Sequence, residues 1–355
     1  MVYNGTNREN GEINMKKALI HYFTGTGNSL VAAEQLTKEE CLCDYEFTFH
    51  PIEKGNRNDI KDFSLHLFFF PVFATSVPHI VRKYIHNLEP GNMAKAVVIS
   101  TNGKISTRFR DGYQGWALHQ ARICLKAKHY DVVLSETLDL PYNVTIVAPP
   151  RNDKVNKIIL TEGLKPLSII ANRITEQQSY HRRIFLANFL WCIPFGVLYS
   201  LFGRRGFGKL FGADASCNQC KQCVRECPVK AIRSDGRSIR WKLNCEGCLR
   251  CINSCPKHAI QTSTVRLIVM LGAMFLNPFY LIYPNVKDRI SADFTPFAVH
   301  MIEAIYYVFS VLLFWFLLDQ LIIFLSRFTV FRKIFGFGHT RFYGRYHAKK
   351  LNSKD

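Results

Sequence analysis

Short apolar runs alternate with amphipathic stretches from Met15 to about Arg151. Most of the apolar runs are continuous, which is typical of strands buried on both faces of a sheet. With right-handed crossovers, the pattern predicts an α/β doubly wound parallel sheet. The predicted strands are 17–23, 45–52, 65–73, 95–101 and 131–138, and the predicted helices are 28–40, 78–88 and 114–127.

The rest of the chain changes composition several times. The sheet domain is expected at 15–151, after a polar extension at 1–14. Residues 152–213 predict a helical linker that includes one apolar helix, and eight cysteines define a module at 214–262. Residues 263–326 predict a hydrophobic helical hairpin with the length to cross a membrane, followed by a basic tail at 327–355.

A loop rich in glycine and hydroxyl residues follows the first predicted strand. Small residues let the backbone curl around an anion, and N–H groups, hydroxyls and the positive end of a helix stabilise negative charge. The loop contains no lysine and lacks the G-x-G-x-x-G spacing of dinucleotide sites. It therefore favours a phosphate monoester, with a well-capped helix start as the alternative. Its residues are Thr24, Gly25, Thr26, Gly27, Asn28 and Ser29.

This loop resembles the loop that binds the FMN phosphate in flavodoxins, at the matching place after the first strand. In that family two further loops flank the flavin. The resemblance implies this role for Phe73, Ala74 and Thr75 after the third strand, and for Thr101, Asn102 and Gly103 after the fourth. Residues 141–143 follow the fifth strand and are expected to border the same crevice. Tyr113 and Trp116 are candidates for stacking on the flavin, with ordinary packing as the alternative.

The eight clustered cysteines form two copies of one spacing, C-x2-C-x2-C-x3-C followed by proline. This spacing matches bacterial two-cluster ferredoxins and implies two [4Fe–4S] clusters, with the fourth cysteine of each run bound to the other cluster. Zinc also uses C-x2-C pairs, but it does not explain the third step or the duplicated proline. The resemblance assigns one cluster to Cys217, Cys220, Cys223 and Cys255, and the other to Cys245, Cys248, Cys251 and Cys227.

Together the two motifs are similar to a bacterial and archaeal family that fuses an N-terminal flavodoxin-like domain to a two-[4Fe–4S] ferredoxin domain. The similarity covers about residues 15–262, and residues 340–347 resemble an Arg-Tyr-His ending of that family. It implies a flavodoxin-like sheet domain and an α+β ferredoxin domain. The apolar stretch 263–326 departs from the compact members.

The remaining cysteines and His21 have structural interpretations. Cys41 and Cys43 form a C-x-C pair, which is a weak redox signal, while Cys124 and Cys192 are predicted to be packing residues. His21 interrupts a buried strand, and we predict a hydrogen-bonded core residue rather than a metal ligand.

The chain is strongly basic, with 46 Lys and Arg residues against 27 Asp and Glu residues. Because the basic residues cluster beside apolar segments, we expect redox proteins and an anionic membrane surface as partners, and no nucleic acid. Residues 185–202 have arginines at both ends and are expected to lie on a membrane surface or to pack against protein. The pair 267–283 and 304–325 is expected to form the hairpin, with the tail in the cytoplasm; buried or membrane-surface helices are the alternative.

No general acid, base or nucleophile stands out, so no catalytic residue is assigned. We expect an electron-transfer iron–sulfur flavoprotein that passes electrons between two [4Fe–4S] clusters and FMN. The alternatives are a membrane-associated flavin-dependent reductase of a small or quinone-like acceptor, and a non-catalytic redox sensor with an empty flavodoxin-like fold. The expected location is the cytoplasmic face of the membrane, with the cytoplasm as the alternative.

Overall fold

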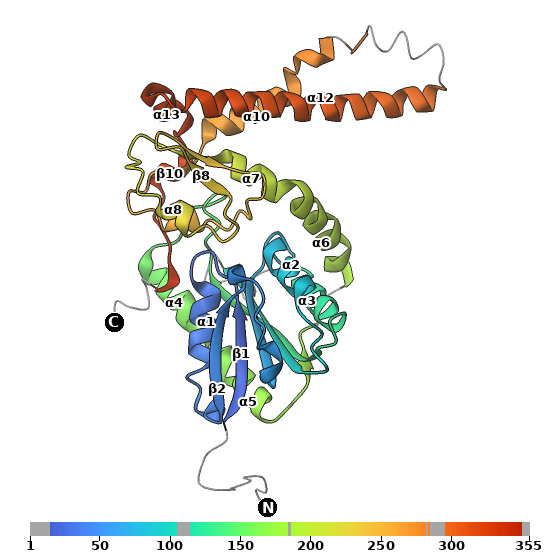
Figure 1. Ribbon diagram of the computed structural model, residues 1–355, viewed down its shortest axis with the longest axis vertical. Helices are drawn as coiled ribbons and strands as arrows, with labels where there is room; N and C mark the ends of the chain where they lie inside the picture. The colour runs from blue at the N-terminus through green and yellow to red at the C-terminus, as the bar shows by residue number, and fades with distance from the viewer. Residues whose placement is uncertain (1–14, 105–113, 184–185, 282, 285–294, 350–355) are drawn as a thin grey trace, which may run out of the picture. The chain divides into compact units, whose positions relative to one another are not determined.

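A computed structural model describes residues 15–104, 114–183, 186–281, 283–284 and 295–349 (Figure 1). The chain divides into two compact units. Unit 1 comprises Met1–Val144, Pro150–Phe202 and Tyr346–Asp355, and unit 2 comprises Thr145–Pro149 and Gly203–Arg345. The extension predicted at 1–14 lies outside the described residues.

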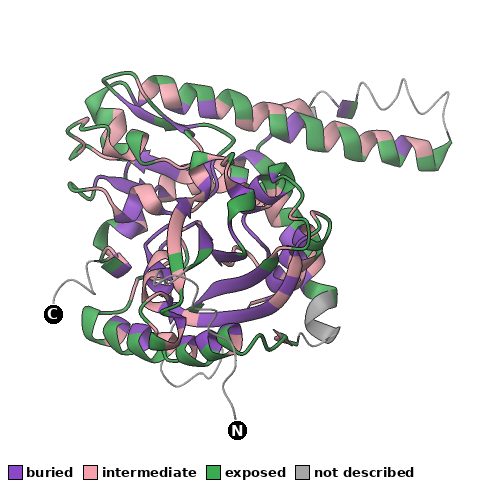
Figure 2. Cartoon of the chain, turned by 60° about the horizontal axis from the view of Figure 1, so that its bottom comes forward, coloured by how far each residue is buried: buried purple, intermediate pink, exposed green. Residues whose placement is uncertain are grey.

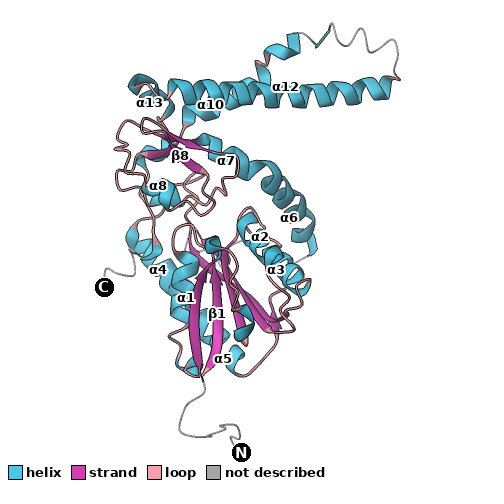
Figure 3. Ribbon diagram, in the orientation of Figure 1, coloured by secondary structure: helices cyan, strands magenta, loops and turns pink. Residues whose placement is uncertain are grey.

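Unit 1 contains a six-stranded sheet in the order β2-β1-β3-β4-β5-β6 (Figure 3). Every neighbouring pair of strands is parallel. The predicted doubly wound parallel sheet is therefore confirmed. The strands are β1 (Lys16–Tyr22), β2 (Tyr45–Pro51), β3 (Leu65–Pro71), β4 (Lys95–Lys104), β5 (Asp131–Pro141) and β6 (Tyr180–His181).

Helices cover both faces of this sheet. Figure 1 shows α1 and α5 on one face and α2 and α3 on the other. Ile20, Phe69 and Val97 on the inner strands are completely shielded from solvent, so the sheet itself forms the centre of the core (Figure 2). The helices are α1 (Asn28–Leu36), α2 (His79–Asn87), α3 (Ala117–Lys126), α4 (Asp153–Leu164), α5 (Pro166–Thr175) and α6 (Leu186–Leu198).

The structure places α4, α5 and α6 in unit 1, within the segment expected to be a linker. Leu160 of α4 and Ile170 of α5 are buried in the same hydrophobic cluster as Ile20. Their apolar residues recur at helical spacing, so each helix packs one side against the sheet and leaves its polar side in water. Residues 152–175 thereby complete the core of unit 1.

Unit 2 is built from short elements. β7 (Phe211–Ala213) pairs antiparallel with β10 (Ile260–Thr262), and β8 (Ile232–Ser234) pairs antiparallel with β9 (Ile239–Trp241). Two single-turn helices, α8 (Gln222–Arg225) and α9 (Arg250–Asn253), lie within the cysteine runs. α7 (Arg204–Leu210) precedes β7.

The apolar segment of unit 2 folds as two helices that contact each other. α10 (Thr264–Phe275) packs against α12 (Pro296–Leu325), and Trp315 Nε1 donates to the Met270 carbonyl over 2.8 Å. Asn277 Nδ2 also donates to Ser310 Oγ over 2.7 Å. α10 has 12 residues, about 18 Å, and ends before the Asn277-Pro278 pair. This first arm is shorter than the predicted stretch 267–283.

Among the described residues, α12 is the one helix long and apolar enough to cross a membrane by length and composition. It has 30 residues, and an 18-residue window within it has a mean hydropathy of 2.4. The basic tail that follows is folded up to its described end. α13 (Thr329–Phe335) and a short 3-10 turn (His339–Phe342) belong to unit 2, where Thr340 Oγ1 accepts from the Thr262 N–H over 2.8 Å.

Candidate functional site

The predicted phosphate loop links β1 to α1 in unit 1. Gly27 has φ +100 and is the N-cap of α1, a conformation that favours glycine. Its N–H donates to Thr24 Oγ1 over 2.9 Å, which tightens the turn. Thr26 and Ser29 are buried. The loop therefore has the curled backbone that the sequence predicted.

The N-cap of α1 is Gly27, which has no side chain to cap the helix. The first N–H groups of a helix have no partner within the helix, and their dipoles add to the positive end of the helix. In α1 these groups belong to Asn28, Ser29 and Leu30. These N–H groups and the buried hydroxyls of the loop can donate hydrogen bonds to a phosphate. The loop itself contains no lysine or arginine. The residues present thus fit a phosphate monoester.

The ends of β4 and β5 contact this loop. Ser29 Oγ lies 3.0 Å from Thr101 Oγ1, and Asn28 Nδ2 donates to the Pro141 carbonyl over 3.0 Å. Asn143 Nδ2 donates to Thr26 Oγ1. The structure therefore brings Thr101 and residues 141–143 to the phosphate loop, as expected for the carboxyl edge of a parallel sheet.

Thr101, Asn102 and Gly103 are strand residues, which corrects the prediction of a loop after residue 101. β4 continues to Lys104 because β5 also extends, and Asn102 pairs with Asp139 in the register. Asn102 Nδ2 donates to Asp139 Oδ1 over 3.4 Å, while Asn102 Oδ1 is buried without a hydrogen-bond partner among the described residues. That oxygen is an acceptor at the carboxyl edge of the sheet.

The loop predicted to flank the flavin after the third strand is a tight turn that follows β3. Phe73 and Ser76 exchange backbone hydrogen bonds of 2.9 Å, and Ala74 and Thr75 both have positive φ. Trp116 Nε1 donates to Ser76 Oγ over 2.9 Å, so this indole supports the turn through its polar edge. Thr75 Oγ1 donates to the carbonyl of Cys192, a buried residue of α6. Tyr113 lies outside the described residues.

The strand order 2-1-3-4-5, with the glycine-rich loop at the switch between β1 and β3, decides the fold of unit 1. This unit has the flavodoxin-like fold. The pocket of about 230 Å³ lined by Lys16, Leu65 and Lys95 lies at the opposite, amino edge of the sheet. It is therefore separate from the phosphate loop.

Solved structures of similar fold cover less than half of this chain. The azoreductase from Bacillus anthracis str. Sterne is 13% identical with a TM-score of 0.32, over 45% of this chain and 100% of the other. A flavodoxin from the domain Archaea is 15% identical with a TM-score of 0.31, over 44% and 98%. Flavodoxin 2 from Bacillus cereus is 15% identical with a TM-score of 0.32, over 45% and 99%. The chain matches no protein-family model and no curated protein.

Four cysteines of unit 2 line one small cavity. They are Cys227, Cys245, Cys248 and Cys251. The ferredoxin resemblance assigns the same four cysteines to the second cluster. Apolar side chains of Phe211, Ile232 and Trp241 line the same cavity. Burial raises the pKa of Cys245 to about 12. Cys227, from the first run, thus lies among the cysteines of the second.

The other four cysteines are also neighbours. Burial, together with the nearby charges of Cys217, Cys255 and Cys220, raises the pKa of Cys223 to about 12. Cys255 belongs to the second run, yet it lies within electrostatic range of Cys217 and Cys223. Cys255 is therefore a neighbour of Cys217 and Cys223, two cysteines of the first run.

The two runs have the same local structure. Each cysteine of the second run lies 28 residues after its counterpart, as Cys245 does after Cys217. The N–H of Ala231 donates to Cys227 Sγ over 3.2 Å, and the N–H of Ala259 donates to Cys255 Sγ over 3.3 Å. Positive φ also recurs at matched positions: Gln219 and Gly247, Lys221 and Leu249, Lys230 and His258. The two cysteine runs therefore repeat in backbone conformation as well as in sequence.

Among the residues that the structure describes, no three His, Cys, Asp or Glu side chains converge on a single metal ion. In a [4Fe–4S] cluster each thiolate binds a different iron, so its ligands lie around a larger group. In unit 2, four thiols line one small cavity.

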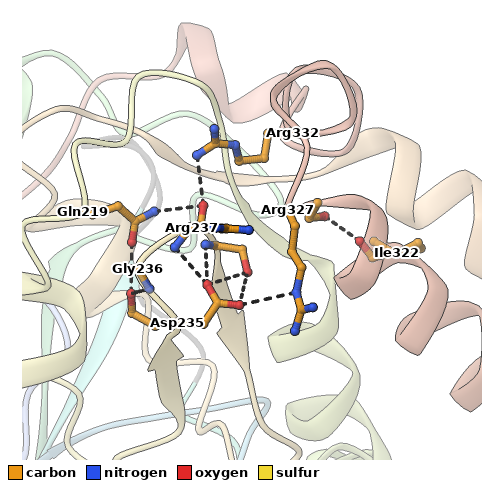
Figure 4. A network of polar contacts seen from close by, with 10 residues as sticks. Gln219, Asp235, Gly236, Arg237, Ile322, Arg327 and Arg332 are labelled. Atoms are coloured by element: carbon orange, nitrogen blue, oxygen red, sulfur yellow. Dashed lines mark hydrogen bonds and ion pairs between the residues drawn. The ribbon is translucent and has the colours of Figure 1, made fainter.

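A polar network supports the first cysteine run (Figure 4). Gln219, between Cys217 and Cys220, donates to the Arg237 carbonyl over 3.4 Å and accepts from Ser234 Oγ over 3.0 Å. Arg332 of α13 donates to the same carbonyl over 2.9 Å. The turn between β8 and β9 is therefore joined to the C-terminal tail through hydrogen bonds to Arg237.

Asp235 closes that turn. Burial alone would raise the pKa of its carboxyl, but hydrogen bonds from Ser238 and the Arg237 N–H, with the charge of Arg327, outweigh burial and lower it. Asp235 Oδ1 accepts from the Ser238 N–H over 2.7 Å. Sequence reasoning missed this carboxylate, although the Ser-Asp-Gly sequence at 234–236 indicates a turn.

Proposed function

We propose that this protein is an electron-transfer iron–sulfur flavoprotein. Unit 2 would hold two [4Fe–4S] clusters, and unit 1 would hold FMN with its phosphate on the loop Thr24–Ser29. The grouping of Cys227 with Cys245, Cys248 and Cys251 around one cavity is the observation that carries the proposal. A structural zinc site would need four ligands but no exchange between the two duplicated runs.

The residues of each unit have distinct roles in this proposal. In unit 2 the eight cysteines bind iron, and the N–H groups of Ala231 and Ala259 stabilise negative charge on sulfur. In unit 1 the N-terminus of α1 and the hydroxyls of Thr26 and Ser29 would bind the phosphate. FMN bound there would supply the exchange between one-electron and two-electron transfer. Redox proteins outside the chain would supply and accept the electrons.

The ligand grouping is tested by two matched double variants, purified without oxygen. Cys223→Ala with Cys255→Ala removes two ligands of the same cluster, so about four of about eight irons should remain. Cys223→Ala with Cys227→Ala damages both clusters, and the iron content should fall close to zero. Cys43→Ala, an exposed thiol outside the runs, is the control. The reverse order of iron contents would show that each run binds its own cluster.

Flavin content tests the other half of the proposal. The native chain should carry about one FMN, measured on the same sample as iron and acid-labile sulfide. Iron without flavin, even after FMN is added, would favour the redox sensor over the electron-transfer protein. Turnover of a quinone without a protein partner would instead favour the reductase.

We further propose an anionic membrane surface as the location. α12 exposes an apolar stripe at intervals of three or four residues, made of Phe297, Met301, Ile305, Phe309, Leu312 and Phe316. Basic residues follow it at Arg327, Arg332 and Lys333. An exposed apolar surface beside basic residues favours contact with an anionic membrane.

Flotation with lipid vesicles tests this location. The protein should float with vesicles that contain anionic lipid, and less with neutral vesicles. Phe309→Glu with Phe316→Glu should abolish flotation, and Glu303→Gln should not. A variant that floats as well as the native chain would contradict the role of the stripe.

A further inference from the structure

The end of the chain belongs to unit 1 and lies against the phosphate loop. Tyr346 is 2% exposed and Ala348 is completely buried. Both lie in the hydrophobic cluster that also contains Ile20 and Val31. A polar, basic tail would ordinarily stay in water, so the burial of these two residues shows that the segment Tyr346–Lys349 is part of the fold of unit 1.

Three contacts join the segment Tyr346–Lys349 to the phosphate loop and to α1. The Tyr346 hydroxyl donates to Asn28 Oδ1 over 2.5 Å, and the Ala348 N–H donates to the Thr26 carbonyl over 2.9 Å. Lys349 Nζ lies 2.7 Å from Glu34 Oε1 on α1. Each contact ends on an oxygen of the loop or helix. None of the three therefore uses an N–H group that a phosphate would need.

Asn28 is fixed from two sides. Its Nδ2 donates to the Pro141 carbonyl at the end of β5, and its Oδ1 accepts from Tyr346. Asn28 is also the first residue of α1. Its position therefore determines the direction of the N–H groups at the start of the helix.

The segment also packs closely on Gly27. A Cβ atom at Gly27 would lie 3.2 Å from Ala348 Cβ and 3.3 Å from His347 Cε1. The loop has no Lys or Arg, and the segment places the imidazole of His347 beside it.

We propose that Tyr346–Lys349 is a C-terminal clasp of the phosphate loop, with Tyr346 as a positioning residue. The clasp holds Asn28, and with it the N-terminus of α1, in the conformation that binds the phosphate of FMN. This inference rests on the proposed FMN site. It assigns the end of the chain to the cofactor site.

The test compares Tyr346→Phe with the control Tyr180→Phe, which removes a hydroxyl from β6. Flavin-free protein is titrated with FMN and with riboflavin, and flavin fluorescence reports binding. Loss of the hydrogen bond to Asn28 should weaken FMN binding about three- to tenfold. Riboflavin, which lacks the phosphate, should bind both variants within about twofold of the native chain.

Deletion of residues 346–355 separates the clasp from the opposite arrangement. A clasp predicts weaker FMN binding after deletion, by at least about tenfold. Tighter FMN binding would show that the segment blocks the site and would overturn the proposal. Unchanged FMN binding would also overturn it, because the segment would then be structural only.

Amide hydrogen exchange gives a readout that does not depend on flavin. In flavin-free protein, Tyr346→Phe should speed exchange in residues 24–31, and Tyr180→Phe should leave it unchanged. If the native chain binds no FMN, the proposed function fails while this experiment still tests the clasp. Slow exchange in both variants would show that Tyr346 does not hold the loop.

Discussion

Tyr346 donates a hydrogen bond of 2.5 Å to Asn28, across 318 residues of sequence. The contact joins the last described segment of the chain to its first βα turn. Contacts of such long sequence separation carry a large loop-closure cost, so the packing around them must offset it. Tyr346 achieves this through its buried ring as well as its hydroxyl.

The same contact predicts how stability responds to substitution. Tyr346→Phe keeps the buried ring but leaves Asn28 Oδ1 without its donor, so the free energy of unfolding should fall by about 1–3 kcal/mol. Lys349→Ala removes a pair that is largely exposed, and the change should stay below about 1 kcal/mol. Urea denaturation measures both. Equal losses of stability in the two variants would show that the Tyr346 hydroxyl contributes no more than the exposed pair of Lys349 and Glu34.

Gly27→Ala should reduce FMN content and leave iron content unchanged. The substitution forces a Cβ into positive φ, which costs about 1–3 kcal/mol, and places it against Ala348. Gly55→Ala is the matched control, because Gly55 has φ +82 with no atom within 4 Å of a Cβ. The control therefore carries the backbone strain without the contact. Flavin and iron analysis of both variants measures the difference, and full FMN content in Gly27→Ala would contradict the loop assignment.

Buried histidines in the sheet of unit 1 predict that the stability of the protein falls in acid. His21 Nδ1 lies 2.7 Å from the Tyr84 hydroxyl, and His21 Nε2 lies 3.1 Å from His66 Nδ1. Burial lowers the pKa of His66 to about 4, and burial with the neighbouring His66 lowers that of His21 well below its ordinary value. As predicted, His21 is a hydrogen-bonded core residue.

In the unfolded chain these histidines take up protons at about pH 6.5. The unfolded state therefore binds more protons, and stability falls as the pH drops from about 6.5 towards about 4. His66 alone should account for about 3 kcal/mol at the lower end. Thermal melting at pH 7.5 and 5.5 measures the trend, with His66→Gln expected to flatten it. If the melting temperature falls equally with pH in the native chain and in His66→Gln, the loss of stability in acid comes from other groups.

Periodicity and spacing predicted the parts of the structure that depend on local sequence. The five long strands of unit 1 are mostly continuous apolar runs, and the cysteine runs of unit 2 have a fixed spacing, so both are visible within a few residues of sequence. Asn102 was misplaced because the fourth strand was predicted to end at residue 101, while pairing with Asp139 keeps Asn102 in the strand. The contact between Tyr346 and Asn28 has no local signal, since a tyrosine in a basic tail predicts nothing about its partner.

A buried ion pair in unit 2 gives a further prediction. Asp319 is the only charged residue of the apolar stretch 304–325, and its Oδ2 lies 2.6 Å from Lys209 Nζ of α7. The side chains are only 7% and 15% exposed. Asp319→Leu leaves the ammonium buried without its partner, so the free energy of unfolding should fall by about 3–5 kcal/mol.

Lys209→Met together with Asp319→Leu removes both charges and fills the space with apolar atoms. The double variant should recover most of the lost stability, because neither member of the pair then remains buried alone. Thermal melting of the native chain, the single variant and the double variant measures the recovery. A double variant as unstable as Asp319→Leu would show that packing at α12, rather than the uncompensated charge of Lys209, determines the loss.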